Sequence, residues 1–332
     1  MLTLEQLVHR LVELIPDEKV AEVKTLVVHR FPDDDCWLCL WQARKFIPKT
    51  ADAEVVFVNA GERVPGSDGD ESVLHFDTGG GEYDQHGRRL QRSCSAAILA
   101  EGLGHLEDPG LKPLLEMVTA VDNVEPLPST SIHYAIEGYP RMLKNPDGTI
   151  DWQKVQNRVF ELFEIVYTRE TRSAQARENL QRHAEWTSLP NGLRVAALLW
   201  HPELREAAYE AGAAVVIWTI SKGKKGFYVG IQRNRNYPEL RLGIAALHLR
   251  EAEAETRGIN TAGKNLSYVG GGQPIPTWFL HDSSALILSG SRSWKLKEDE
   301  FTKLTPRETV MLTHQALSRI SRDKVAQWAT SP

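Results

Sequence analysis

Continuous apolar runs and amphipathic segments alternate along the first half of the chain. Val23–Val28 is apolar and rich in β-branched residues, which is typical of a strand buried on both faces. The expected strands are Val23–Val28, Glu54–Asn59 and Ser72–Phe76, and the expected helices are Asp35–Phe46, Ser93–Gly102, Leu111–Val121 and Trp152–Thr168. This alternation predicts an α/β fold with a mostly parallel sheet flanked by helices.

A polar segment from Asp151 to about Glu185 contains neither Gly nor Pro and predicts an extended connector helix. A turn cluster at Ser188–Gly192 then opens a second, smaller α/β region. Its expected strands are Leu193–Leu199, Ala214–Ile220, Phe227–Gln232 and Ala285–Leu288, and its last helix runs from about Thr305 to Arg322. We therefore expect one domain over residues 1–150, a helical connector over 151–188 and an accessory domain over 189–332.

Composition agrees with a globular protein of two domains. The chain has 332 residues, of which 42% are hydrophobic, and domains average about 150 residues. No stretch approaches the roughly 18 consecutive apolar residues of a membrane span. Leu2–Ile15 has apolar positions at helical spacing, which predicts an amphipathic helix rather than an export signal. We therefore expect a cytoplasmic protein that does not associate with a membrane.

The net charge and the cysteine content each disfavour a class of protein. A net charge of −5 disfavours a protein that coats long nucleic acids, because such proteins carry a basic excess. Three cysteines in a chain without an export signal argue against a disulfide framework. Cys36 and Cys39 lie three positions apart on one face of an expected helix, so we interpret them as core residues rather than a zinc or redox pair.

The most informative polar cluster follows the first expected strand. His29, Asp33 and Asp35 lie at its carboxyl end, where open α/β sheets bind ligands, and Pro32 ends the strand. A histidine with carboxylates is a ligand set suited to manganese or another divalent first-row metal. The alternative is a charged turn in which Asp33 or Asp34 caps the next helix.

Three further clusters follow at the ends of expected elements, namely Asp77, Asp84–His86 and Asp122. Several carboxylates converge only if a cation offsets their repulsion. Two divalent ions about 3.5–4 Å apart would do so, with Asp77 as the bridging ligand. Such a centre would activate a water molecule for in-line attack on phosphorus.

In order and in loose spacing these motifs resemble those of the DHH phosphoesterases. The resemblance runs from His29-x-x-x-Asp33-x-Asp35 through Asp77 and Asp84-Gln85-His86 to Asp122. The branch it resembles most is the family of melanocyte proliferating gene one, which are metal-dependent exonucleases, because the string Gly-Gly-x-Tyr-Asp-x-His ends here at His86. The resemblance is strong over residues 25–125 and thin beyond 190.

The resemblance implies roles for these residues. His29 and Asp33 would bind one ion, Asp35 and Asp122 the other, and Asp77 both; the expected ion is Mn2+, with Mg2+ as the alternative. His86 would contact the scissile phosphate or assist the leaving group, with Asp84 beside it. The family's first histidine is replaced here by Gln85, whose amide oxygen is a poorer metal ligand. The sequence is therefore compatible with a centre of one ion and with a centre of two ions. His86 or His75 would be the substitute ligand.

Candidate substrate contacts come from two regions. Arg88 follows His86 closely. Gly270-Gly271-Gly272-Gln273 is similar to the glycine-rich substrate loop of the accessory domain in this superfamily, and exposed backbone N–H groups there would hold an anion. Arg233 and His281 are further candidates. Each of these residues also fits a surface or packing role.

Three functions are compatible with this pattern. The first is a metal-dependent phosphodiesterase or exonuclease acting on nucleotides or short single-stranded oligonucleotides. The second is a pyrophosphatase or polyphosphatase with the same metal core. The third is a binding module that senses nucleotides without turnover, for which Gln85 is the best support. The oligomeric state is open, with a homodimer as one option.

Overall fold

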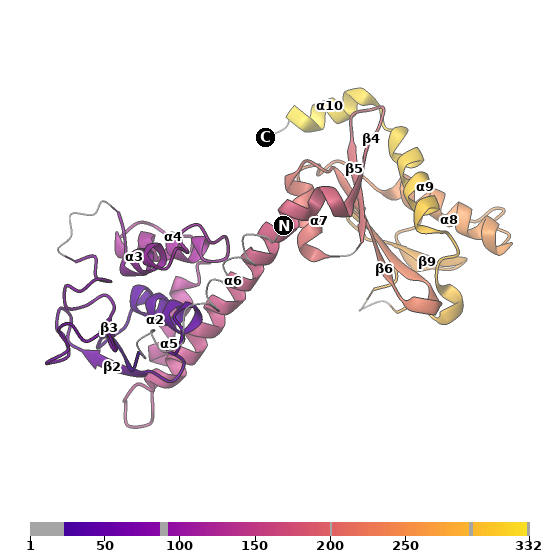
Figure 1. The fold of residues 1–332 in the computed structure, drawn as a ribbon. Helices are drawn as coiled ribbons and strands as arrows, with labels where there is room; N and C mark the ends of the chain where they lie inside the picture. Colours follow the sequence, from indigo (N-terminus) through magenta and orange to yellow (C-terminus); the bar gives the residue numbers. More distant parts are fainter. Residues whose placement is uncertain (1–22, 87–91, 200, 292–294, 331–332) are drawn as a thin grey trace, which may run out of the picture. The chain divides into compact units, whose positions relative to one another are not determined.

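The computed structural model describes residues 23–86, 92–199, 201–291 and 295–330. The chain divides into two units, Met1–Arg172 and Ser173–Pro332, and the boundary falls within a single long helix (Figure 1). The amphipathic helix expected over Leu2–Ile15 lies outside the described residues. No helix in the part of the chain that the structure describes is both long and apolar enough to span a membrane.

The first unit is built on a three-stranded parallel sheet in the order β2-β1-β3. The strands are β1 (Thr25–His29), β2 (Glu54–Val58) and β3 (Val73–His75). The central strand β1 is buried through Leu26, Val27 and Val28, which accounts for its continuous apolar run. The parallel arrangement brings the carboxyl ends of β1 and β3 to the same edge of the sheet.

Among its described residues this unit also has five helical segments: α2 (Asp34–Phe46), α3 (Ser95–Gly102), α4 (Lys112–Asp122), α5 (His133–Met142) and the first part of α6 (Trp152–His183). The helix α2 packs into the core through Trp37 and Trp41, and the ring of Trp41 meets that of Phe163 of α6 edge-on, with 6.1 Å between the ring centroids. Helix α5 was not among the expected elements, whereas the polar segment expected to form a long helix is α6.

The second unit contains a seven-stranded sheet in the order β4-β5-β6-β7-β10-β9-β8. Only β5 (Arg194–Leu199) and β6 (Val215–Ser221) pair in parallel within it. Strand β6 pairs antiparallel with β7 (Phe227–Arg233), the next strand along the chain. The remaining strands are β4 (Ala184–Ser188), β8 (Gly270–Gly272), β9 (Ile275–Leu280) and β10 (Leu286–Ser289).

Helices cover both faces of this second sheet. Alternate residues of β5 and β6 point to opposite sides. Val195, Val215 and Ile217 pack in one core with α8 (Gly243–Arg257) and α9 (Pro306–Ser318). Ala196 and Val216 pack in another core with α7 (Pro202–Glu210) and the end of α6. The last helix is α10 (Arg322–Thr330). The expected α/β fold class, with a parallel first sheet and a second α/β unit, is confirmed.

Candidate metal centre

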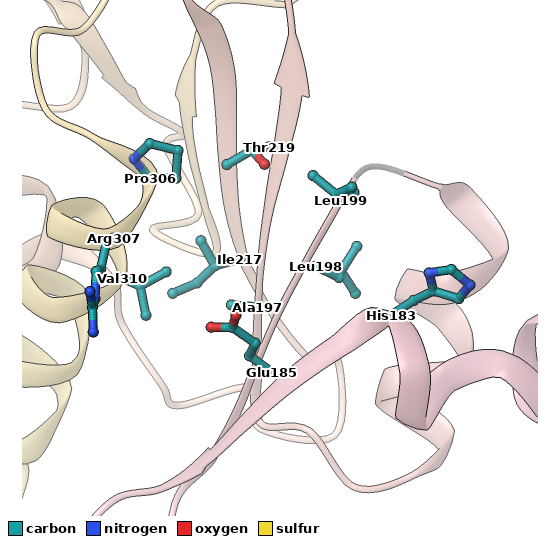
Figure 2. Close-up of a pocket in the computed structure, with 10 residues that line it drawn as sticks. All are labelled: His183, Glu185, Ala197, Leu198, Leu199, Ile217, Thr219, Pro306, Arg307 and Val310. Atoms are coloured by element: carbon teal, nitrogen blue, oxygen red, sulfur yellow. The ribbon is translucent and has the colours of Figure 1, made fainter.

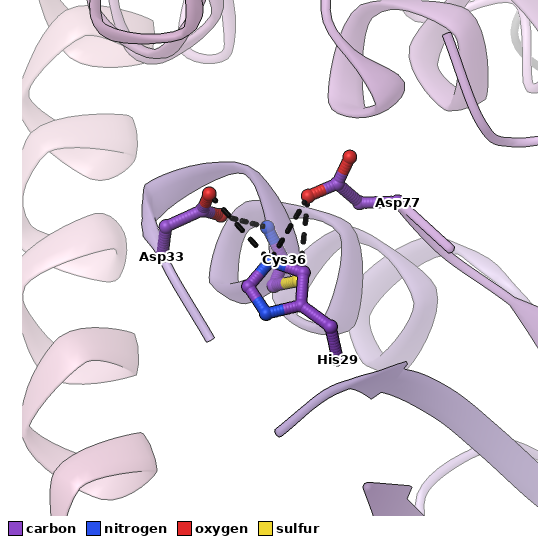
Figure 3. Close-up of side chains that lie close together, drawn as sticks. All are labelled: His29, Asp33, Cys36 and Asp77. Carbon is purple, nitrogen blue, oxygen red and sulfur yellow. Dashed lines mark hydrogen bonds and ion pairs between the residues drawn. The ribbon is translucent and has the colours of Figure 1, made fainter. Parts of the chain in front are cut away.

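His29 and Asp33 flank the turn between β1 and α2, Asp77 follows β3, and the three side chains meet at the carboxyl edge of the first sheet (Figure 3). His29 Nε2 lies 3.6 Å from Asp33 Oδ2 and 3.3 Å from Asp77 Oδ2. The Cys36 thiol donates to the same Asp77 Oδ2 at 3.6 Å. One potential ligand atom from each of these four residues lies within 4.8 Å of the others.

Asp33 has two structural tasks. Its Oδ1 caps α2 by accepting hydrogen bonds from the backbone N–H groups of Asp35 at 3.0 Å and Cys36 at 3.1 Å. Its Oδ2 faces His29. The capped turn and the ligand set were alternatives in the sequence, but one carboxylate can serve both. Asp34 is not the cap: its Oδ2 pairs with His133 Nδ1 of α5 at 2.8 Å.

Asp77 adopts an unusual backbone conformation. Its φ is +52°, in the left-handed region that Gly, Asn and Asp tolerate best. Its backbone N–H donates to Tyr83 O at 3.0 Å, which stabilises the turn after β3. The side chain is almost fully buried. This conformation lets Asp77 present Oδ2 to His29 and Oδ1 to the segment that follows.

Asp84 holds the turn that carries His86. Its Oδ2 accepts from Gly80 N at 2.7 Å, and its Oδ1 accepts from His86 N at 2.8 Å. His86 Nδ1 lies 3.0 Å from Asp84 Oδ1 and 3.4 Å from Asp77 Oδ1. The imidazole of His86 is 68% exposed, whereas Asp84 is buried. Asp84 therefore positions His86, which is the member of the pair that solvent can reach.

Gln85 lies between two carboxylates. Its amide Nε2 donates to Asp77 Oδ1 at 3.2 Å and lies 3.4 and 3.3 Å from the two oxygens of Asp122. Its Oε1 accepts a hydrogen bond from the hydroxyl of Ser95. The structure thus places the nitrogen of this amide, not its oxygen, next to the acidic side chains.

Asp35 connects α2 to α3. Its Oδ2 accepts from Ser95 N at 2.8 Å and its Oδ1 accepts from Ala96 N at 2.7 Å. It therefore satisfies N–H groups at the start of α3, a helix whose own N-cap residue, Cys94, makes no side-chain cap. Both oxygens of Asp35 already have a partner, and Asp35 is not a member of the clusters formed around His29 and His86.

The electrostatics of the centre show an excess of negative charge. Hydrogen bonds to Asp33 and then Asp77 raise the pKa of His29 to about 10. Desolvation pushes the pKa of Asp33 upward, but its bonds to His29 and Cys36 N outweigh this and lower it. Burial, followed by the charge of Asp77, raises the pKa of Asp122 to about 6. A cation is therefore favoured here, and a proton on His29 supplies one in the metal-free protein.

Burial, followed by the charge of Asp77, also raises the pKa of Asp35 well above its ordinary value. Burial raises the pKa of the Cys36 thiol in the same way. The expectation that Cys36 packs in the core is confirmed, because it is fully buried there. The sequence interpretation missed its second contact, with Asp77. The available signal was its place in the first turn of α2, three residues after Asp33.

The donor set around His29 fits a divalent ion, because imidazole and carboxylate oxygens converge from independent segments. The donors around Asp122 do not fit a second ion in the same way, because an amide nitrogen lies among them. His75 does not fill that gap: its Nε2 accepts from Val64 N at 3.2 Å and lies 3.4 Å from Ser67 Oγ, so it holds the loop after β2.

The candidate substrate residues occupy separate places along the chain. Arg88 lies outside the described residues. Gly270–Gly272 form the edge strand β8, and Gln273 follows it in an exposed position. Arg233 donates to the carbonyls of Asn234 and Tyr237, and His281 Nδ1 lies 2.9 Å from Ser283 Oγ.

Strand register nevertheless brings some of these positions to one end of the second sheet. Arg233 N donates to Ala285 O, His281 N donates to Leu286 O, and Gly270 pairs with Leu280. Arg250 is fully buried and donates to the carbonyl of Gly270 at 2.9 Å, as well as to those of Leu266, Tyr268 and Trp278. Arg250 therefore fixes the start of the glycine strand.

A pocket of about 480 Å³ also lies in the second unit, between the sheet and α9 (Figure 2). Its polar lining is limited to His183, Glu185, Thr219 and Arg307, and the rest of its lining is apolar. It contains none of the candidate substrate residues named above.

Comparisons with known proteins give few matches. No family model matches the chain, and no curated protein matches it. One similar solved structure is a member of the s1p family of ribosomal proteins described as a DHH domain. The alignment covers 90% of this chain and 88% of that chain at 11% identity, with a TM-score of 0.30. A TM-score of this size does not establish a common fold over the whole chain.

Proposed function

We propose that this protein is a metal-dependent phosphodiesterase of the DHH type that hydrolyses nucleotides or short single-stranded oligonucleotides. The observation that carries the proposal is the convergence of His29, Asp33 and Asp77 at one edge of a parallel sheet, with ligand atoms within 4.8 Å of one another. The order of the acidic motifs along the chain, which resembles that of the DHH phosphoesterases, supports it further.

His29, Asp33 and Asp77 would hold the ion, and Cys36 lies close enough to be an additional donor. Nitrogen and oxygen ligands of this kind suit Mn2+ and also accept other divalent first-row ions. When bound, such an ion supplies a Lewis acid that lowers the pKa of water and offsets charge on phosphoryl oxygens. His29 serves as a ligand only after it loses its proton, so metal and proton compete for Nε2.

His86 is the side chain of the centre best placed to contact a phosphate. It is exposed, and Asp84 fixes its ring through Nδ1. Its Nε2 has no hydrogen bond among the residues that the structure describes. An imidazole held in this way can donate a proton to the leaving oxygen. Asp84 acts through His86 and is a positioning residue.

The proposal is tested by assaying short RNA, short DNA, linear and cyclic dinucleotides and inorganic pyrophosphate with Mn2+, with Mg2+ and with EDTA. We expect hydrolysis that depends on the metal and a preference for nucleotide substrates. Release of phosphate from pyrophosphate alone would favour the pyrophosphatase alternative. No hydrolysis of any substrate on the panel would overturn the enzyme assignment.

One observation favours the alternative of a binding module without turnover. The amide of Gln85 donates to Asp77 and faces Asp122, so it supplies hydrogen bonds to part of the acidic cluster without a metal. This alternative predicts that isothermal titration calorimetry detects nucleotide or metal binding while no product forms. The same panel therefore separates the two functions.

A further inference from the structure

We propose that the side-chain amide of Gln85 takes the place of a second cation, so that this protein binds a single divalent ion per chain, at His29, Asp33 and Asp77. The inference deepens the proposed function and rests on its metal centre. It assigns to Gln85 the role of a hydrogen-bond donor rather than that of a metal ligand.

The two oxygens of Asp77 have different partners. Oδ2 lies 3.3 Å from the ring nitrogen of His29 and accepts from the Cys36 thiol. Oδ1 accepts from Gln85 Nε2 at 3.2 Å and lies 3.4 Å from His86 Nδ1. The Oδ2 side is therefore lined by groups that can become ligands by losing a proton. The Oδ1 side is lined by the amide N–H2 group of Gln85, which remains a donor at any ordinary pH, and by His86, whose Nδ1 already lies 3.0 Å from Asp84 Oδ1.

Ser95 fixes the direction of the Gln85 amide. Its hydroxyl is fully buried and donates to Gln85 Oε1. With the oxygen held there, the nitrogen points to Asp77 and Asp122, which accept through three oxygens at 3.2 to 3.4 Å. Ionised carboxylate oxygens accept hydrogen bonds but cannot donate them, so the opposite orientation of the amide would bring its oxygen against these carboxylates.

Asp35 is not available for a second ion either. Its two oxygens accept the backbone N–H groups of Ser95 and Ala96 at 2.8 and 2.7 Å. Withdrawing Asp35 from them would leave buried donors at the start of α3 without a partner, which is costly. Asp35, Asp122 and Oδ1 of Asp77 are thus all satisfied by hydrogen-bond donors of the protein itself.

Metal counting tests the inference without any enzymatic activity. The full-length protein is stripped with EDTA, dialysed, loaded with excess Mn2+ and freed of unbound metal. We expect about one ion per chain by elemental analysis, and an electron paramagnetic resonance spectrum of isolated Mn2+. Two ions per chain with an exchange-coupled spectrum would overturn the inference and leave the proposed function standing. No bound ion would overturn both.

A matched pair of variants tests the role of the amide itself. Gln85→Glu keeps the size of the side chain but replaces the donor by a third carboxylate, so we expect close to two ions per chain and a coupled spectrum. Gln153→Glu makes the same change at an exposed position of α6, and its count should stay at one. A count of one in folded Gln85→Glu, verified by circular dichroism, would contradict the assigned role.

Discussion

His29 Nε2 lies 3.3 Å from Asp77 Oδ2, so the last residue of β1 is joined to the second residue after the end of β3. The contact is possible because β1 and β3 are neighbours in a parallel sheet. Their carboxyl ends meet at one edge, where two turns present their side chains to each other.

Asp77→Asn should abolish metal-dependent hydrolysis while the protein still folds. Asn tolerates the left-handed φ of +52°, but its neutral amide is a weak ligand. We expect the Mn2+ affinity to fall by at least about 10-fold, a loss typical of damaged metal sites. Calorimetry measures the affinity, and circular dichroism verifies the fold. The exposed Asp52→Asn is the matched control, and full activity in Asp77→Asn would contradict the assignment.

Stability of the metal-free protein should depend on the protonation of His29. Its pKa is about 10 in the folded protein against an ordinary 6.5. A raised pKa means that the folded form holds the proton more tightly, so this stabilisation is complete below pH 6.5 and is lost as the pH rises to about 10. In EDTA, the Tm of the wild type should therefore fall over this range by more than that of His29→Gln.

Saturating Mn2+ should reduce this difference, because the ion replaces the proton on Nε2. Thermal melts across the pH range with and without Mn2+ provide the measurement. If the Tm of the wild type and the Tm of His29→Gln fall by the same amount in EDTA, the contact of His29 with Asp33 and Asp77 does not hold the proton.

His86→Gln should lower kcat without changing the metal count. The loss of a proton donor of this kind typically reduces the rate by about 10²- to 10⁴-fold. Asp84→Asn should cause a smaller loss and shift the pH profile of kcat, because Asp84 acts through the ring of His86. The exposed His201→Gln in the second unit is the control. A changed Mn2+ count in His86→Gln would instead make His86 a ligand.

Asp34→Ala should destabilise the first unit and leave the metal affinity nearly unchanged. Asp34 is buried, and its Oδ2 pairs with His133 Nδ1 at 2.8 Å, which joins α2 to α5. Leaving a buried polar group without its partner costs about 1–3 kcal/mol. Urea denaturation measures the loss, with Asp52→Ala as the control. A large fall in Mn2+ affinity would place Asp34 in the metal centre.

Arg250→Met should destabilise the second unit by about 3 kcal/mol or more, because several buried carbonyls lose a charged donor at once. Arg250 bonds to the carbonyls of Gly270, Leu266, Tyr268 and Trp278. If the glycine strand β8 contacts substrate, the more conservative variant Arg250→Lys should raise KM more than it lowers kcat. Denaturation and steady-state kinetics on Arg250→Lys separate these effects.

The sequence predicts best those helices and strands whose apolar residues follow one clear pattern. Strand β1 and helix α2 have a clear apolar pattern, and both are found at nearly the expected bounds. Helix α5 gave no such signal, because it is short, contains Pro140 and buries only Ile136. The helix forms because tertiary contacts, such as the pair between His133 and Asp34, compensate for weak local preference.

In the site, His29 meets Asp77 because each lies at or just beyond the carboxyl end of one of two parallel strands, and the sequence pattern predicts both strands and a mostly parallel sheet. The direction of the Gln85 amide does not follow from it, since an amide can donate or accept. Only the buried Ser95 hydroxyl and the position of Asp122, which are distant in sequence, decide between the two. The interpretation of Asp34 as a cap failed for a related reason, because its partner His133 belongs to the unexpected helix α5.

The left-handed backbone at Asp77 restricts the evolutionary routes away from this centre. Of the residues that accept such a φ without strain, Asn and Gly remove the charge and Asp keeps it. A Glu at this position would retain the charge but strain the turn. Substitution at position 77 would therefore remove the carboxylate rather than replace it with another acid, and a descendant without this carboxylate could keep the fold intact.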